Sequence, residues 1–114
     1  MPTPQILEKK NYKRLRWKNG LGYTDEIAIH PASADLKRGD FLWRISTARI
    51  EQASPFSIFP NHDRFLVVLS GRGVRLTHTF TEGEEERVEV PLFYPYEFPG
   101  DVPSRCDLTD GPIT

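Results

Sequence analysis

The sequence lacks the features that mark several classes of protein. It has one cysteine, Cys106, in 114 residues, which excludes an internal disulfide and a cysteine-based zinc site. Its longest apolar run, residues 65–69, is far too short to cross a bilayer, and no signal peptide follows Met1. Lys and Arg number 15 against 16 Asp and Glu, so no overall basic charge attracts nucleic acid or a membrane. We therefore expect a cytoplasmic protein that binds neither.

The residues that are present indicate a β protein. Ten prolines and eight glycines separate short stretches rich in Val, Ile, Phe, Tyr and Thr. Gly71 and Gly73 predict a tight hairpin between two of these stretches, because glycine accepts positive φ angles. The charged segment 82–86 predicts an exposed turn. No long helix is expected, and strands are predicted at residues 12–17, 25–30, 41–50, 64–70, 74–80, 87–92 and 105–108.

Many short strands at close spacing predict an all-β fold, a jelly-roll β-sandwich or small barrel. A chain of 114 residues supports one core, so we expect a single domain over residues 1–114.

Alternation along the third predicted strand separates its side chains into two sets. Phe41, Trp43 and Ile45 share one face, which we predict to be core, while Arg44 and Ser46 lie on the other. An arginine in such a strand must reach solvent or enter a cavity where an anion meets it. The same argument applies to Arg64, because it begins the predicted strand at residues 64–70, which is also mostly apolar.

Seven ordered blocks of this sequence resemble the HutD family, which includes the Ves proteins. The blocks are residues 17–24 (WKNGLGYT) with Glu26-Ile27, then 43–46 (WRIS), 55–60 (PFSIFP), Asp63-Arg64, 69–73 (LSGRG), Phe98 with Gly100-Asp101, and 106–112. The resemblance implies a cupin-like β-sandwich or barrel, typically with two such units in one chain. It thus implies that residues 1–114 are the N-terminal half of a bicupin. One departure is Leu21, which stands where the family usually has glycine.

The resemblance also implies a function. It suggests a bacterial protein with a regulatory role in histidine utilisation, with formylglutamate as a candidate ligand, and it assigns no reaction. A guanidinium holds a carboxylate through two parallel charge-assisted hydrogen bonds, so a small anionic metabolite is the expected ligand. The predicted ligand-binding residues are Arg64, Asn19, Arg44, Ser46 and Trp17. For Arg64 the structural alternative is a salt bridge with Asp63 or Glu97.

A metal site is not expected. The usual cupin set needs a His-x-His pair and further ligands, whereas His30, His62 and His78 are isolated, and His30 and His78 are interpreted as surface residues. No cofactor is predicted. Cys106 is interpreted as a small core residue, and Asp101 as a turn residue.

Two further hypotheses stay open. One is a metal-independent cupin enzyme, an isomerase or hydrolase acting on a small acid, with Asp63 or Glu97 as the base. The other is a homodimer that pairs through an exposed sheet edge.

Overall fold

The computed structural model describes residues 7–17, 22–36 and 38–114, so Asn19 and Leu21 lie outside the described residues. The chain forms two compact units, Met1–Ala48 and Arg49–Thr114. The single domain over residues 1–114 stays a prediction. No helix among the described residues is long and apolar enough to span a membrane.

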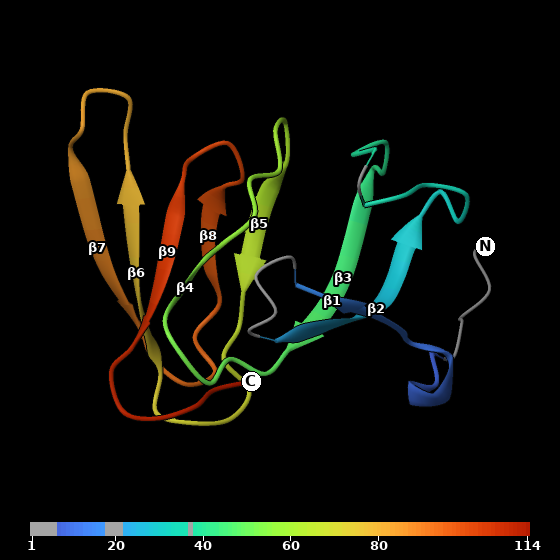
Figure 1. Ribbon diagram of the computed structural model, residues 1–114, viewed down its shortest axis with the longest axis horizontal. Helices are drawn as coiled ribbons and strands as arrows, with labels where there is room; N and C mark the ends of the chain where they lie inside the picture. The colour runs from blue at the N-terminus through green and yellow to red at the C-terminus, as the bar shows by residue number, and fades with distance from the viewer. Residues whose placement is uncertain (1–6, 18–21, 37) are drawn as a thin grey trace. The chain divides into compact units, whose positions relative to one another are not determined.

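The first unit is built on a three-stranded antiparallel sheet. A short 3-10 turn (Lys9–Asn11) leads into β1 (Lys13–Arg16), β2 (Tyr23–His30) and β3 (Trp43–Ala48), which lie in that order across the sheet (Figure 1). The β1–β2 hairpin is closed by a 2.9 Å hydrogen bond from the Trp17 N–H to the Gly22 carbonyl. A Cβ on Gly22 would lie 3.0 Å from the Trp17 ring, so glycine lets the indole pack on the backbone.

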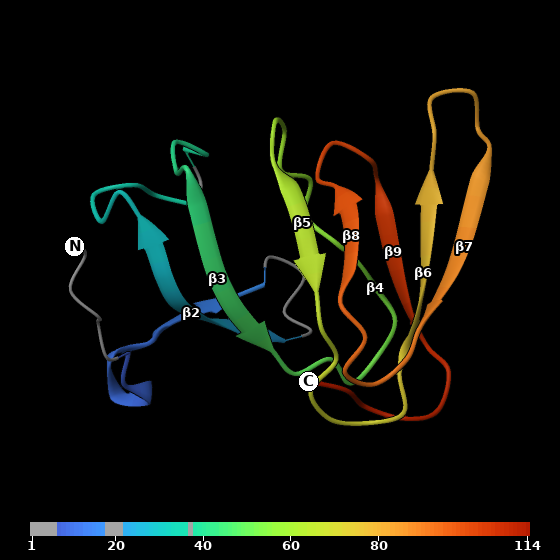
Figure 2. The ribbon, with the colours of Figure 1, turned by 180° about the vertical axis from the view of Figure 1, so that it is seen from behind.

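The second unit contains two antiparallel sheets. Its strands are β4 (Ser54–Pro55), β5 (Asp63–Leu66), β6 (Val74–Thr79), β7 (Glu85–Val90), β8 (Tyr96–Pro99) and β9 (Ser104–Leu108). One sheet has the order β4-β9-β6-β7 and the other pairs β5 with β8 (Figures 1 and 2). Its buried apolar side chains are Ile50, Val68, Val74, Leu76, Val90, Phe98, Cys106 and Ile113.

The predicted all-β class is confirmed, and every predicted strand has a counterpart. The strands that the sequence did not predict are β4 and β8. The short β8 lies among Pro91, Pro95 and Pro99, residues that usually mark loops. The predicted turn at residues 82–86 is exposed and overlaps the β6–β7 connection, residues 80–84, whereas Glu85 and Glu86 already belong to β7.

The predicted hairpin around Gly71 and Gly73 is wrong in its pairing. Both glycines have positive φ, +95° and +101°, as expected. However, β5 pairs with β8, whereas β6 pairs with β7 and β9. The connection instead crosses between sheets, and Leu69 donates its N–H to the Thr114 carbonyl at 2.7 Å. Passage of consecutive strands to different sheets is typical of a β-sandwich.

Candidate functional site

A β-bulge in β2 brings a carboxylate onto the face of Arg44. The register between β2 and β3 shifts between Glu26 and Ala28, so Glu26 lies opposite Ser46 while Ile29 lies opposite Arg44. Residues opposite each other in an antiparallel sheet share a face. The bulge therefore aims Glu26 toward the side of Arg44, as bulges commonly do beside functional groups.

Glu26 and Arg44 form a buried ion pair. The Arg44 Nε donates to Oε1 of Glu26 at 2.9 Å, and the two side chains are 9% and 10% exposed. The Arg44 Nη1 lies 3.5 Å from the Ser46 hydroxyl, a weak contact. The Arg44 Nη2 is buried and has no hydrogen-bond partner among the described residues. Arg44 thus meets an anion inside the fold, and that anion is a carboxylate of the protein.

The predicted core face of β3 is wrong. Trp43 is 48% exposed and Ile45 is 50% exposed, although Phe41, just before the strand, is buried as predicted. The Trp43 ring stacks on His30 with 5.6 Å between centroids, and His30 is exposed as expected. The buried face of β3 therefore carries the ion pair of Arg44, and the apolar Trp43 and Ile45 lie on the more exposed face.

Trp17 is half-buried at the base of the β1–β2 hairpin. Its indole Nε1 donates to the Thr24 hydroxyl at 2.8 Å, and its ring packs against Gly22. These contacts explain the spacing of tryptophan, glycine and threonine in this block. Ligand contact by Trp17 stays a prediction, as it does for Arg44 and Ser46.

An open hollow of about 360 Å³ lies in the first unit. Its volume is at the lower end of the range of ligand pockets. Lys13 and Glu26, which pair across β1 and β2, both line it, so it contains charges of both signs. Other residues around it are Asn11, Ile29, His30 and Trp43.

Arg64, in the second unit, lies among aromatic rings. Its guanidinium carbon is 4.9 Å from the centroid of Phe59 and 5.2 Å from the centroids of Phe56 and Phe98. Its Nη1 donates to the Ser57 carbonyl at 2.9 Å. Phe98 is the register partner of Arg64 across β5 and β8, so both side chains share a face. The half-buried cation is therefore held by these rings and by its bond to the Ser57 carbonyl.

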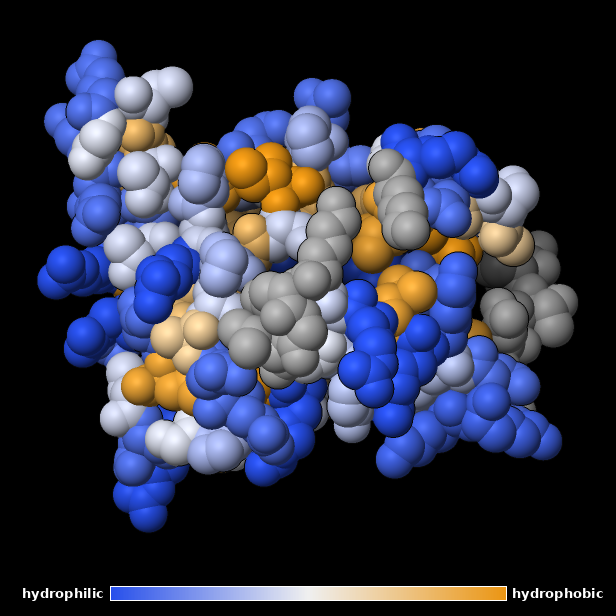
Figure 3. All heavy atoms as spheres, in the orientation of Figure 1, coloured by the Kyte–Doolittle hydropathy of each residue, from blue (hydrophilic) through white to orange (hydrophobic). Residues whose placement is uncertain are grey.

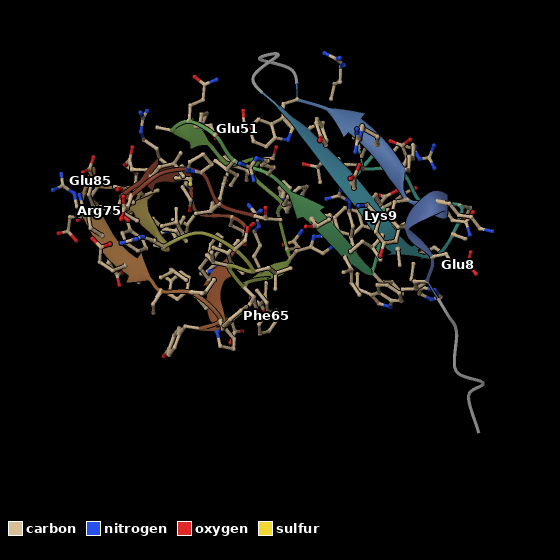
Figure 4. All side chains as sticks on the ribbon, turned by 90° about the horizontal axis from the view of Figure 1, so that it is seen from below. Glu8, Lys9, Glu51, Phe65, Arg75 and Glu85 are labelled. Carbon is tan, nitrogen blue, oxygen red and sulfur yellow. The ribbon has the colours of Figure 1, made fainter. Side chains whose placement is uncertain are left out.

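The two faces of β5 differ in exposure. Leu66 is partly buried beside Arg64, whereas Phe65 is 72% exposed and projects from the opposite face (Figure 4). Asp63 and Glu97 belong to that outer face, because Asp63 alternates with Arg64 and Glu97 pairs with Phe65.

The loop that carries the Arg64 rings is tied to the turn after β8. Phe59 donates its N–H to the Gly100 carbonyl at 2.8 Å, and Gly100 donates to the His62 carbonyl at 2.7 Å. The Asp101 carboxylate accepts the Asn61 N–H at 2.9 Å. Asp101 is thus a turn residue, as expected, and it also anchors this loop.

A buried polar cluster lies next to Phe98. His78 contacts the Ser104 hydroxyl through Nδ1 at 2.6 Å and the Tyr96 hydroxyl through Nε2 at 2.8 Å. Its ring is 5.0 Å from that of Phe98, between centroids. Burial lowers the pKa of His78 and raises the pKa of Tyr96.

The interpretation of His78 as a surface residue is wrong, since it is 3% exposed. Val74, Leu76 and His78 alternate along β6 on one face, and the first two are buried. This period of two was the sequence signal that could have placed His78 inside. Tyr96 and Ser104 carried no comparable signal, because β8 was not predicted.

The donor set does not fit the metal that many cupins hold. Across residues 7–17, 22–36 and 38–114, no group of three His, Cys, Asp or Glu side chains is placed to bind a metal ion. Cys106 is fully buried, as predicted for a core residue, and burial raises the pKa of its thiol to about 12.

These features define a cupin-like β-sandwich protein with a buried Arg–Glu pair in one unit and an aromatic-lined arginine in the other. The HutD family model matches residues 9–114, so the chain belongs to the HutD family.

Relatives of known sequence or structure agree with this assignment. An uncharacterised 21.2 kDa protein in the hutC 3' region of Pseudomonas putida is 37% identical over 99% of this chain and 56% of its own length. The protein Ves of Cronobacter sakazakii is 36% identical over 83% of this chain and 48% of its own. The chain thus spans about half the length of these relatives.

Two solved structures share the fold. A conserved protein of unknown function from Pseudomonas aeruginosa PAO1 has a TM-score of 0.79 at 35% identity, covering 96% of this chain and 53% of that one. HutD from Pseudomonas fluorescens SBW25 has a TM-score of 0.76 at 36% identity, covering 94% of this chain and 54% of that one.

Proposed function

We propose that this chain binds a small anionic metabolite at Arg64, that formylglutamate is this ligand, and that binding serves the regulation of histidine utilisation. The observation that carries the proposal is the half-buried Arg64 guanidinium among the rings of Phe56, Phe59 and Phe98. Aromatic rings attract a cation and keep water from it. A carboxylate that reaches such a cation gains more than it would at a solvated arginine, because the local dielectric constant is lower.

We propose Arg64 for the main contact, because three aromatic rings surround its guanidinium. The charge of Arg44 is already met by Glu26 at 2.9 Å, so a second anion there would face a carboxylate. We keep Arg44, Ser46, Trp17 and Asn19 as proposed contacts of lower rank.

The link to histidine utilisation rests on relatives. One relative is named for its position in the hutC 3' region, and a solved neighbour is named HutD. The proposal transfers this context to the present chain, together with the cytoplasmic location that the sequence favours.

The enzyme hypothesis gains no support from the positions of its two bases. Asp63 and Glu97 are both exposed, on the face of the β5–β8 pair opposite to Arg64. An acid–base residue has to lie within hydrogen-bonding reach of the substrate. The geometry therefore favours binding over turnover at this position.

For the proposed homodimer, β5 is a better edge than β7. The β7 strand carries charged side chains at Glu85, Arg87 and Glu89, and hydrophilic residues cover much of the β6–β7 end in Figure 3. Charges along an edge strand oppose pairing with another chain. On the outer face of β5 the exposed Phe65 is uncharged and has a single charged strand neighbour, Asp63.

Calorimetric titration of the full chain tests the binding proposal. Formylglutamate is titrated into the wild type, Arg64→Ala and Arg75→Ala, with glutamate, histidine and urocanate as comparison ligands. Arg75 is the matched control, because its ion pair with Glu89 lies at the outer edge of the same unit (Figure 4). We expect selective binding that Arg64→Ala weakens at least roughly tenfold and Arg75→Ala leaves unchanged. Equal affinity in all three proteins would contradict the proposal.

A further inference from the structure

A chain of three hydrogen bonds runs through the second unit from Tyr96 to a backbone carbonyl. The Tyr96 hydroxyl lies 2.8 Å from His78 Nε2, and His78 Nδ1 lies 2.6 Å from the Ser104 hydroxyl. The Ser104 hydroxyl donates to the Val102 carbonyl at 3.0 Å. A carbonyl oxygen can only accept, and a serine hydroxyl carries a single proton. The end of the chain therefore fixes the direction of the bond between His78 and Ser104. The direction of the Tyr96–His78 bond follows once the charge of His78 is known.

The Val102 carbonyl at the end of this chain of bonds determines which atom of Ser104 and His78 carries the bonding proton. Because the Ser104 hydroxyl donates its hydrogen bond to the Val102 carbonyl, the Ser104 oxygen accepts a hydrogen bond from the Nδ1–H of His78. Burial lowers the pKa of His78, so the imidazole is neutral at pH 7 and has one proton. Its Nε2 then accepts, and Tyr96 donates. The Tyr96 hydroxyl thus donates its one hydrogen bond to His78. Toward any further group its oxygen can only accept a hydrogen bond.

Tyr96 lies beside the Arg64 rings. Tyr96 and Phe98 alternate on β8 and share a face, and Phe98 is the register partner of Arg64. The Tyr96 and Phe98 rings stack with 5.6 Å between centroids, and the Arg64 guanidinium carbon lies 5.2 Å from the Phe98 centroid. One aromatic ring thus contacts both the cation and the tyrosine.

We propose that Tyr96 presents a hydrogen-bond acceptor to a ligand held at Arg64, and that this selects ligands with a neutral N–H group beside a carboxylate, as in an N-acylated amino acid. The proposal rests on the binding function proposed for Arg64. A free amino acid is disfavoured because its ammonium group would lie near the guanidinium. His78 and Ser104 act as positioning residues, since they set the direction of the Tyr96 hydroxyl.

The first test needs no ligand. Long-range ¹H–¹⁵N spectra of the wild type at pH 7.5, with His78→Gln to assign the signals, report which ring nitrogen carries the proton. We expect the Nδ1–H tautomer in the wild type. The Nε2–H tautomer would overturn the proposal, because Tyr96 would then accept from His78 and could donate its own proton to the ligand.

The second test compares two ligands that differ in one atom. Formylglutamate has an amide N–H, and 2-formyloxyglutarate has an ester oxygen in its place. We expect Tyr96→Phe to weaken formylglutamate binding roughly 5- to 10-fold and to leave binding of the ester unchanged. Equal effects on both ligands would overturn the role of Tyr96 while leaving the Arg64 site intact. A wild type that binds neither ligand would overturn the Arg64 site, and the selectivity with it.

Discussion

The Arg44 guanidinium and the Glu26 carboxylate meet at 2.9 Å inside the first unit, and each side chain is about nine-tenths buried. The bulge in β2 makes this contact possible, since it sets Glu26 on the face of Arg44. Two charges taken out of water stabilise a fold only when they stay together.

Removal of one partner should therefore be costly. We expect Arg44→Met to lower the free energy of unfolding by about 3–5 kcal/mol, because Glu26 is then buried without its cation. The double change Arg44→Met with Glu26→Leu should recover most of that loss. Urea denaturation measures both. The control is Arg49→Met, whose pair with Glu51 is exposed on both sides and should contribute little. A loss for Arg44→Met no larger than that control would contradict the buried pair.

Gly100 has no room for a side chain. A Cβ there would lie 2.5 Å from the Phe59 carbonyl oxygen and 2.7 Å from that of His62. We expect Gly100→Ala to destabilise the protein by about 1–3 kcal/mol and to weaken ligand binding, because Phe59 is one of the Arg64 rings. Thermal unfolding and calorimetry measure the two effects. Gly83→Asn, at an open turn with φ +81°, should leave ligand binding unchanged and destabilise the protein less, because a Cβ there meets no atom and asparagine tolerates positive φ. A wild-type melting temperature for Gly100→Ala would be inconsistent with the close contact.

The pH dependence of stability should report His78. Its pKa lies below the ordinary value of 6.5, mainly because burial disfavours the charged ring, although the Glu86 charge acts in the opposite direction. The unfolded chain then binds the proton more readily, so this contribution is present above pH 6.5 and is lost as the pH falls toward the folded pKa.

We expect wild-type stability to fall below pH 6.5 by at most about 1.4 kcal/mol per pH unit from this one group. Urea denaturation between pH 7.5 and 5 measures the slope. His78→Gln should flatten it, whereas exchange of the exposed His30 for glutamine should not. An unchanged slope in His78→Gln would show that this ring does not titrate as inferred.

The thiol of Cys106 should be inert in the folded protein. It is fully buried, and its pKa is raised to about 12 by burial and by the charge of Asp107. Since the thiolate is the reactive form, we expect no reaction with a colorimetric thiol reagent at pH 8, and one thiol per chain after unfolding in guanidinium. Rapid labelling of the folded chain would contradict the burial of Cys106.

The fold class could be predicted from the sequence because the local pattern determines it. Short apolar stretches between prolines and glycines define most of the strands, and positive φ at Gly71 and Gly73 follows from their residue type. Strand pairing could not be predicted in this way. The chain leaves β5 for another sheet through tertiary contacts, such as that between Leu69 and Thr114, which are far apart in sequence.

The site was predicted in part for the same reason. Arg64 was identified on a strand with a buried face, and the rings of Phe56 and Phe59 lie in a block that the family resemblance contains. The partner of Arg44 was not identified, because it depends on a bulge that no residue pattern indicated. Tyr96 was missed because β8 lies among prolines.

The central claim is that the Arg64 guanidinium binds a carboxylate ligand. The most direct measurement follows the arginine Nε–H signals in ¹H–¹⁵N spectra during a titration with formylglutamate, with Arg64→Lys to assign the Arg64 signal and Arg75 as the internal reference. We predict a saturable shift of the Arg64 signal while that of Arg75 stays in place. A ligand that binds without moving the Arg64 signal, or no binding at any concentration, would contradict the claim.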